Sequence, residues 1–385
     1  MKPRILCFVA YYLPGYRSGG PVRTIANLVD HLGAEFEIFI ITRDRDALDT
    51  DPYPDVLVDE WNQVGTARVF YASKRYLTFS GVAKLMRETK HDAIYLNSFF
   101  SFEFTCLPLL ARRLGIAPFR QCLIAPRGEF SKQAIALKAV RKKTYLNFVK
   151  LVRLYSNLKW QASSELEIRD IRRIMNIHPR DIFLAPDMPP NSYPIKSQIR
   201  SRGKGYLRIV FISRISPMKN LDFLLKALKR VSSQIELGIY GPIREPGYWA
   251  TCEKLIKELP NRVKAEYKSE LQPFEVISIF SDYDLFVLPT RGENYGHVIL
   301  ESLMAGTPVL ISDQTPWRAT NDGAIELLSL DDISDWAAAI DRWAVYSAEV
   351  LKARREGALA FSERYLKSDT VIQKNRELFL SVLGP

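Results

Sequence analysis

The sequence lacks the long apolar runs, cysteine pairs and histidine clusters that mark several classes of protein. No run of 18 apolar residues occurs in the 385-residue chain, so no membrane-spanning helix is expected. The four cysteines have no CxxC spacing and the four histidines no metal-ligand spacing, which predicts a reduced, cytoplasmic protein without structural zinc. The opening MKPRILCFVAYYLPG has an apolar run too short for a signal peptide and is expected to form the first strand.

Two catalytic fingerprints are also missing. The sequence has no GxGxxG motif, which argues against a nicotinamide cofactor. Acidic residues are spaced in TRDRD (42–46) and DPYPD (51–55), but their cationic and polar neighbours predict surface loops, and no Asp-x-Asp pair ends a strand. We therefore expect neither a metal nor a cofactor. A dehydrogenase built from two α/β domains is an alternative that these absences disfavour.

The chain has a formal net charge of +11, and one segment accounts for it. Residues 112–173 hold 15 lysines and arginines against 4 acidic residues, while the rest of the chain is neutral. Such a segment is either a solvated helix face or a surface that docks anionic lipid or an anionic acceptor. Nucleic acid is not expected as a partner, because no RNP-like or zinc-finger signature accompanies the charge.

Short apolar runs alternate with helical patterns along the whole chain. Continuous apolar strands separated by helices predict a parallel sheet covered on both faces. The alternation restarts after residue 206, so the sequence predicts an α/β fold of two Rossmann-like, doubly wound domains facing a cleft. The expected strands lie at 4–10, 36–42, 67–72, 93–97, 121–126, 182–186, 207–213, 235–240, 262–267, 285–289 and 308–312, and the clearest helices near 21–32, 80–90, 103–114, 132–154 and 164–175.

A proline- and serine-rich stretch separates the two halves. DMPPNSYPIKSQIRSRGKG (187–205) has no periodicity and predicts a linker. The predicted organisation is an N-terminal domain at 1–190, a linker at 191–205, a C-terminal domain at 206–367 and a helical stretch at 368–385 that packs back on the N-terminal domain. Open α/β sheets bind ligands at the carboxyl ends of their strands, so the loops there are the candidate sites.

Two of these loops carry groups suited to phosphate. YYLPGYRSGGPVRTIANLVDHL (11–32) places Gly19 and Gly20 before a helix, where backbone amides and the helix dipole favour an anion, although a plain tight turn fits equally well. SRISPMKNLDFLLKAL (213–228) places Arg214 and Lys219 after the first strand of the second domain. Two cations there suit a diphosphate, and the alternative is a pair of surface cations.

A third loop, in RGENYGHVILESLMAGTPVLIS (291–312), places two carboxylates around a helix start. The helix that begins at Gly296 is apolar on nearly every side, which predicts that it is buried and that Glu301 needs a partner. That partner is either a structural cation such as Arg214 or a set of sugar hydroxyls. Glu293 lies just before the helix, where its first amides favour an anion.

Taken together, these motifs resemble the family 4 retaining glycosyltransferases, which have the two-domain GT-B fold. The double-glutamate pattern, with seven residues between the two glutamates, is the central feature, and the likeness covers nearly the whole chain. In chain order the motifs that carry it are Gly19-Gly20, WQASSELE (160–167), Arg214, Lys219, Glu293, Gly296, Glu301 and Gly306-Pro308.

The resemblance implies a role for each of these groups. Arg214 and Lys219 would neutralise the leaving diphosphate of a nucleotide sugar. Glu301 would accept the ribose hydroxyls, and Glu293 would hold hydroxyls of the transferred sugar. The other donor contacts would come from backbone at the helix start and in the glycine loop, at Tyr295, Gly296, His297, Val298, Gly19 and Gly20.

The sequence departs from the family pattern at two positions. Asn97 in IYLNSFF and Arg127 in LIAPRGEF stand where many members carry histidine. Arg127 is expected either to help neutralise the diphosphate or to be a plain surface or core-bridging arginine. Recognition of the nucleotide base is expected near Gly241 and Tyr267–Lys268, without a choice of base.

The resemblance also implies a mechanism. A carboxylate nucleophile would need a candidate on the far face of the sugar, and the sequence offers none that is convincing. The family implies metal-independent front-side attack by the hydroxyl of a glycan or lipid-linked acceptor, in bacterial-type surface polysaccharide or glycolipid synthesis. The remaining alternative is a protein that binds anionic membranes or ligands without catalysis.

Within the basic segment, KQAIALKAVRKKTYLNFVKLVRLY (132–155) is expected to form an amphipathic helix. A basic helix of this kind lies on anionic bilayers, so we predict a cytoplasmic protein peripheral to the inner face of the plasma membrane. Alternatively, the apolar stripe packs on the N-terminal sheet and the cations face water. The apolar positions of the stripe are Ile135, Ala139, Leu146, Val149 and Val152.

Overall fold

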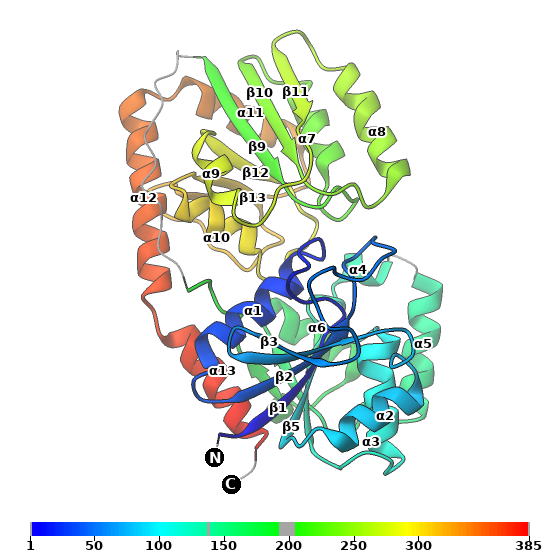
Figure 1. Cartoon of the computed structure of the whole chain (residues 1–385). Coiled ribbons are helices and arrows are strands. Elements are labelled where there is room, and N and C mark those ends of the chain that lie inside the picture. Colours follow the sequence, from blue (N-terminus) through cyan, green and yellow to red (C-terminus); the bar gives the residue numbers. More distant parts are fainter. Residues whose placement is uncertain (1, 137–138, 192–204, 384–385) are drawn as a thin grey trace. The chain divides into compact units, whose positions relative to one another are not determined.

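The computed structural model describes residues 2–136, 139–191 and 205–383 (Figure 1). They form two compact units, one of Met1–Asn191 with Asp369–Pro385 and one of Ser192–Ser368, and each is described by itself below. Each unit has its own sheet of mainly parallel strands covered by helices, as the alternation of apolar runs predicted. The expected linker at 191–205 lies almost entirely outside the described residues.

The N-terminal unit is built on an eight-stranded sheet in the order β3-β4-β2-β1-β5-β6-β7-β8. All neighbours are parallel except β3 and β4, which form an antiparallel edge. β3 and β7 were not predicted, because both are short and mix polar with apolar residues. The strands are β1 (Arg4–Phe8), β2 (Glu37–Arg43), β3 (Trp61–Val64), β4 (Ala67–Ala72), β5 (Ala93–Asn97), β6 (Gln121–Ala125), β7 (Lys159–Ala162) and β8 (Ile182–Leu184).

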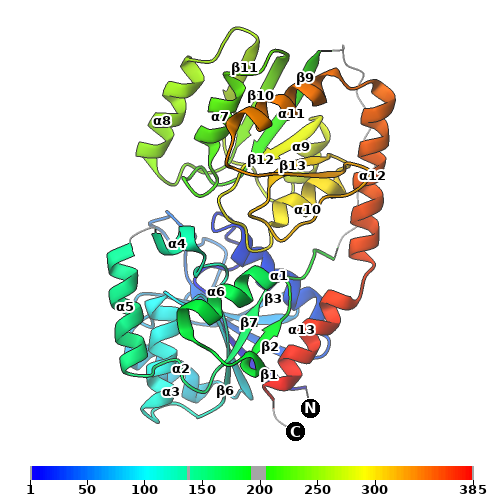
Figure 2. The same cartoon turned by 180° about the vertical axis from the view of Figure 1, so that it is seen from behind.

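Helices cover both faces of this sheet (Figures 1 and 2). Alternate residues of β1 point to opposite faces, so Leu6 and Phe8 belong to one buried core while Ile5 and Cys7 belong to another. The helical segments are α1 (Gly20–Leu32), α2 (Phe79–Glu88), η1 (Phe102–Cys106), α3 (Leu107–Arg113), α4 (Lys132–Ala136), α5 (Ala139–Leu151), α6 (Glu165–Met175), η2 (Pro179–Asp181) and α13 (Thr370–Ser381).

The last helix, α13, packs on the N-terminal unit. The Phe379 side chain is 1% exposed, and its ring centroid lies 5.1 Å from that of Tyr95 on β5. The Asn375 amide donates to the carbonyl oxygen of Pro186 at 2.8 Å, and the Arg376 guanidinium pairs with Glu35 at 2.7 Å. Through these contacts, α13 is part of the N-terminal unit although it comes last in the sequence.

The C-terminal unit has a six-stranded parallel sheet in the order β11-β10-β9-β12-β13-β14. The helices α7 and α11 pack together, as do α10 and α12. The strands are β9 (Tyr206–Ile212), β10 (Gln234–Tyr240), β11 (Val263–Tyr267), β12 (Leu285–Leu288), β13 (Val309–Ser312) and β14 (Ile325–Leu328); the helices are α7 (Leu221–Leu228), α8 (Pro246–Lys257), α9 (Val276–Ser281), α10 (His297–Met304), α11 (Ile333–Val345) and α12 (Ala348–Leu366).

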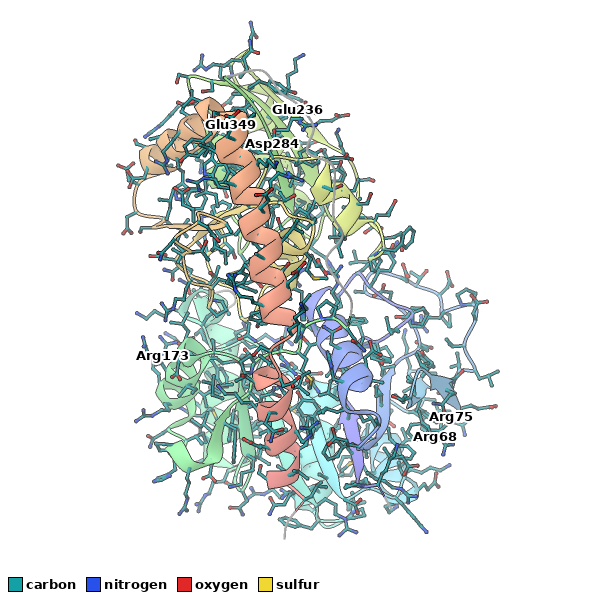
Figure 3. All side chains as sticks on the ribbon, turned by 90° about the vertical axis from the view of Figure 1, so that its left-hand side faces the viewer. Arg68, Arg75, Arg173, Glu236, Asp284 and Glu349 are labelled. Carbon is teal, nitrogen blue, oxygen red and sulfur yellow. The ribbon has the colours of Figure 1, made fainter. Side chains whose placement is uncertain are left out.

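Polar contacts join the amino-terminal ends of the central strands of this sheet. Asp284, labelled in Figure 3, accepts a hydrogen bond from the backbone N–H of Arg208 at 2.9 Å. It also forms an ion pair with the Arg208 guanidinium at 3.3 Å. Glu236, labelled in the same view, lies opposite Arg208 in the register of β9 and β10. These charges occupy the amino edge, and the candidate site residues lie at the carboxyl edge.

None of the described helices is both long and apolar enough to cross a membrane.

Candidate functional site

Two loops meet at the carboxyl edge of the C-terminal sheet. The loop after β12 is hydrogen-bonded to the loop after β9, because the backbone N–H of Arg291 donates to the carbonyl oxygen of Met218 at 2.8 Å. The Arg291 side chain also donates to Asn220 Oδ1 at 3.0 Å. Since β9 and β12 are neighbours in the sheet, their following loops are brought together although some 70 residues separate them in sequence.

Within these loops, Lys219 and Glu293 form an ion pair. The two side chains are only 9% and 15% exposed, so the pair is largely shielded from water. The structure therefore brings together two of the residues that the sequence nominated for catalysis. Removing one partner of a buried pair leaves the other charge uncompensated, which typically destabilises a fold by about 3–5 kcal/mol.

Gly296 makes the approach to α10 possible. Its φ angle of +84° lies in the left-handed region that glycine tolerates. A Cβ atom added there would lie 2.8 Å from Ile299 Cδ1 and 2.9 Å from Glu293 Cγ. The glycine thus lets the Glu293 side chain pack beside the helix start. No side chain caps this end of α10 within the described part of the chain, and no acidic residue lies in its first turn.

The remaining nominated residues of this unit lie around the same helix. Tyr295 and His297 are buried, with ring centroids 4.7 Å apart, and the Tyr295 carbonyl oxygen accepts a hydrogen bond from Trp317 Nε1 at 2.6 Å. Val298 packs against the core of the unit. Their backbone at the start of α10 is therefore held in place by buried aromatic side chains.

Glu301 and Arg214 differ in exposure. Glu301 lies in the second turn of α10; the residue is half-buried and its Oε2 atom is buried, as expected of a carboxylate in or near the interior. The residue is only half-buried because α10 has core contacts on most of its surface but not on all of it, as its intermediate residues Val298 and Glu301 show. Arg214 is exposed on the loop after β9.

The region expected to recognise the nucleotide base is tightly packed. Gly241 has a φ of +130°, and a Cβ atom there would lie 2.0 Å from the Ser213 carbonyl oxygen. The Tyr267 hydroxyl donates to the Gly241 carbonyl oxygen at 3.0 Å. The ends of β9, β10 and β11 therefore approach closely, and recognition of the base at this place stays a prediction.

In the N-terminal unit, Gly19 and Gly20 lie at the start of α1. Gly19 has a φ of +70° and precedes a helix that has neither a side-chain cap nor an acidic residue in its first turn among the described residues. A Cβ atom on Gly19 would meet nothing within 4 Å. The preceding loop is anchored by Asp46, whose carboxylate accepts hydrogen bonds from the backbone of Tyr16 at 2.8 Å and of Arg17 at 3.0 Å.

Arg127 is tied into the N-terminal unit. It forms an ion pair with Asp187, and its guanidinium donates to Asn97 Oδ1 at 2.8 and 3.2 Å and to the Tyr95 hydroxyl. Its side chain is 9% exposed. Burial lowers the pKa of the guanidinium, but the carboxylate of Asp187 and other acidic neighbours outweigh that effect and raise it. These contacts fit the alternative in which Arg127 is a core-bridging arginine. They also include Asn97 in the hydrogen-bond network around Arg127.

The segment with the sequence WQASSELE (160–167) also has a structural role. Ser164 caps α6, and the buried Glu167 carboxylate accepts hydrogen bonds from the backbone of Ser163 at 2.8 Å and of Gly128 at 2.6 Å. Burial raises the pKa of Glu167, against the effect of these hydrogen bonds. The motif therefore fixes the loop after β6, which carries Arg127.

Sequence reasoning missed three residues that hold the site. Asn220 and Arg291 join the two loops of the C-terminal unit, and Asp187 pairs with Arg127. Nothing in the sequence around Asp187, at the start of the proline-rich stretch, indicated that it would pair with Arg127. No cluster of three or more metal-ligating side chains occurs in the part of the chain that the structure describes.

Comparison with known proteins identifies relatives of both the C-terminal sequence and the fold. The family model described as Glycosyl transferases group 1 matches residues 194–344. A D-inositol 3-phosphate glycosyltransferase of Mycobacterium marinum is 27% identical over 139 residues, which covers 34% of this chain and 29% of that protein. The chain thus matches about 30% of the length of such curated relatives.

Solved structures resemble the whole chain. Sucrose-phosphate synthase of Thermosynechococcus elongatus has a TM-score of 0.71 at 18% identity, over 99% of this chain and 100% of that one. HepE of Anabaena, solved in complex with UDP-glucose, has a TM-score of 0.70 at 15% identity, over 98% of this chain and 99% of its own. The Lys219–Glu293 pair and the start of α10 lie inside residues 194–344, which match the glycosyl transferases group 1 family model, and the chain has the GT-B fold.

Proposed function

We propose that this protein is a retaining, metal-independent glycosyltransferase that uses a nucleotide-diphosphate sugar as donor. The observation that carries the proposal is the shielded Lys219–Glu293 pair beside the start of α10, within the region matched by the group 1 family. A cation, a carboxylate and a helix N-terminus at one sheet edge match two parts of such a donor: the cation and the helix N-terminus suit the diphosphate, and the carboxylate suits the sugar hydroxyls. HepE, a structural relative, was solved with UDP-glucose, which supports a donor of this class.

Each residue has a proposed task. Lys219 and the exposed Arg214 neutralise the diphosphate, and the amides of Tyr295 to Val298 bind phosphate oxygens. Glu301 accepts the ribose hydroxyls from its half-buried position on α10. Glu293 leaves its pairing with Lys219 when the donor enters and holds hydroxyls of the transferred sugar. Gly19 and Gly20 supply backbone to the diphosphate from the N-terminal unit.

The chemical step is front-side substitution at the anomeric carbon. The bond from that carbon to the diphosphate oxygen breaks, and the acceptor oxygen forms its bond on the same face of the sugar. The departing phosphate oxygen takes the acceptor proton, so atoms and charge balance without a protein nucleophile. Catalysis then consists of positioning and of charge stabilisation by the two cations, each worth about 2–4 kcal/mol.

The acceptor is proposed to be a glycan or a lipid-linked glycan at the inner face of the plasma membrane, in surface polysaccharide or glycolipid synthesis. The structure corrects the expected docking helix in one respect. Leu146 and Val149 are buried in the N-terminal core, with Ile135 and Val152 packed against it, so the predicted apolar stripe faces inward. It packs there because the core of the unit lies on that side of α5.

A different apolar stripe of α5 supports the membrane proposal. Val140, Phe148 and Leu151 are 82%, 58% and 82% exposed. Residues eight and eleven positions after the first share its helical face, so the three form one ridge. Exposed Arg141 and Lys143 flank it. Apolar side chains bordered by cations suit the interface of an anionic bilayer.

The donor reaction is tested directly. Purified protein is screened by thermal shift with UDP-, GDP- and ADP-sugars, and the stabilising donor is then assayed for hydrolysis without acceptor, with and without EDTA. We expect donor-dependent release of nucleoside diphosphate that survives chelation, and NMR of the sugar product should show the anomeric configuration of the donor. Loss in EDTA restored by Mg²⁺ or Mn²⁺, or an inverted product, would refute metal independence or retention respectively. Vesicle binding without donor turnover would favour the non-catalytic alternative.

A further inference from the structure

The N-terminal unit holds a second concentration of cations, at the edge of its sheet opposite to Arg127. A cavity of about 730 Å³ opens at the amino-terminal ends of β6 and β7. Its walls come from α3, α5, the starts of these strands and the segment before β8, and Figure 2 shows α6 beside β7. Its charged lining residues are Arg112, Lys150, Arg153, Lys159, Arg180 and Asp181.

Arg112 is the buried member of this set. Its residue is 5% exposed, its Nε donates to the Arg120 carbonyl oxygen at 2.8 Å, and its guanidinium carbon lies 3.9 Å from the centroid of the Phe119 ring. Its Nη2 atom is buried and has no hydrogen-bond partner among the described residues. Burial lowers the pKa of Arg112. A buried cation without a counterion is costly, so an anion in the cavity would stabilise it.

The single carboxylate of the lining does not compensate the other cations. Asp181 is shared by Lys159 at 3.0 Å and by Arg180 at 3.9 Å. Lys150 and Arg153 are exposed. Arg153 has a φ of +52°, unusual for a non-glycine residue, and its carbonyl oxygen accepts a hydrogen bond from Arg113 at 2.5 Å. The cavity therefore keeps a positive excess that can meet a ligand.

The positive surface continues past the cavity. A second hollow of about 620 Å³ shares Asn176, Ile177 and His178 with the first, and α6 adds three arginines: Arg169, Arg172 and Arg173. Arg173, labelled in Figure 3, pairs with Asp170 at 2.7 Å, so one of the three is compensated. Seven of the 15 cations that the sequence concentrates in 112–173 thus line these two adjoining hollows.

We propose that the cavity at the amino ends of β6 and β7 binds a phosphate-bearing anion. The positive charge of the buried Arg112 and the neighbouring Lys150, Arg153 and Lys159 suit phosphate oxygens, and the volume suits a ligand of small-molecule size. The ligand is either a soluble phosphate ester or the phosphate headgroup of a lipid, since Phe119, which lines the cavity, and Leu151, which follows the lining residue Lys150 in sequence, are 64% and 82% exposed. This site does not depend on the glycosyltransferase activity, whose proposed groups lie elsewhere.

The test compares two charge-matched double variants on folded, full-length protein. Lys150→Gln with Arg153→Gln removes two cations of the cavity, and Arg141→Gln with Lys143→Gln removes two exposed cations of the same helix that do not line it. Lys219→Ala reports on the proposed donor site. Calorimetric titration with inorganic pyrophosphate should show binding in wild type that weakens at least about tenfold in the first variant only. Donor hydrolysis should be unchanged in both double variants.

Vesicle flotation distinguishes the two sources. Phosphatidylcholine vesicles carrying phosphatidic acid or phosphatidylserine are compared at equal surface charge. A preference for phosphatidic acid that disappears in the first variant assigns the site to a lipid headgroup; pyrophosphate binding without that preference assigns it to a soluble ester. The proposal is overturned if wild type binds neither probe selectively, if both double variants lose pyrophosphate binding equally, or if only Lys219→Ala loses pyrophosphate binding. Arg112→Gln is a supplementary variant, interpreted only where its thermal unfolding matches wild type.

Discussion

At the scale of single residues, the Lys219–Glu293 ion pair is the centre of the proposed function. Both charges are shielded and they pair with each other. In the proposed mechanism, a diphosphate that binds Lys219 replaces the attraction of Glu293, while sugar hydroxyls donate to the released carboxylate. The proposed donor thus exchanges one set of charge-assisted contacts for another.

Lys219→Ala should lower the turnover of donor hydrolysis about a hundredfold, because it removes a cation that stabilises the leaving diphosphate. The Tm should also fall, since Glu293 loses its partner. Lys229→Ala is the matched control, because Lys229 pairs at 2.5 Å with Glu258 in a more exposed position of the same unit. Turnover by Lys219→Ala within threefold of the control would exclude the catalytic role.

Glu301→Gln should weaken nucleotide binding, measured by calorimetric titration, while the Tm stays close to that of wild type. The amide keeps the size of the side chain but loses the charge that strengthens hydrogen bonds from ribose hydroxyls, worth about 1–2 kcal/mol. Glu258→Gln serves as the control outside the site. A variant that unfolds at lower temperature but binds nucleotide normally would assign Glu301 a structural role.

Gly296→Ala should destabilise the C-terminal unit by about 1–2 kcal/mol and weaken donor binding. The left-handed backbone disfavours alanine, and the new Cβ would contact Ile299 and Glu293. Gly247→Ala in α8 is the control, because a Cβ atom there meets nothing within 4 Å. We expect that variant to be neutral or slightly stabilising in chemical denaturation. Equal effects of the two substitutions would contradict the steric argument.

At the scale of elements, α13 is part of the N-terminal unit although it ends the chain. Phe379→Ala should destabilise that unit by about 3–5 kcal/mol, because it removes a side chain that is 1% exposed and packed against Phe36 and Tyr95. Leu380→Ala, one position along the same helix and 52% exposed, should change little. Urea unfolding of both variants is the measurement, and similar midpoints would show that α13 is not a structural part of the core.

At the scale of the whole molecule, the placement of charge underlies the proposed binding to an anionic membrane. Val140→Ser with Phe148→Ser should reduce co-sedimentation with anionic vesicles about tenfold, since it removes exposed apolar area beside the cations of α5. Binding should fall with added salt and with omission of the anionic lipid. Phe274→Ser, at an exposed phenylalanine of the other unit, is the control. Binding that ignores lipid charge, or that both variants lose alike, would contradict the proposed membrane surface.

The sequence by itself determined the fold class, most strands and the identity of the candidate loops. Apolar runs of strand length, spaced by amphipathic helices, report local conformation directly, which is why β1, β2, β5 and β9 to β13 lie where predicted, whereas the short edge strand β14 was not predicted. Lys219, Glu293 and Gly296 were recognisable because strand ends, glycines and isolated charges can be identified from the sequence alone.

Only the tertiary structure decided the partners of these residues. The order of strands brings Lys219 to Glu293 across 74 positions and Arg127 to Asp187 across 60, and no local pattern encodes strand order. The same holds for α5, which has two apolar stripes of similar composition. Only the packing of the unit decides that the core covers one stripe and leaves the other exposed. Periodicity fixes which residues share a face, whereas the packing of distant elements fixes whether that face meets core, solvent or ligand.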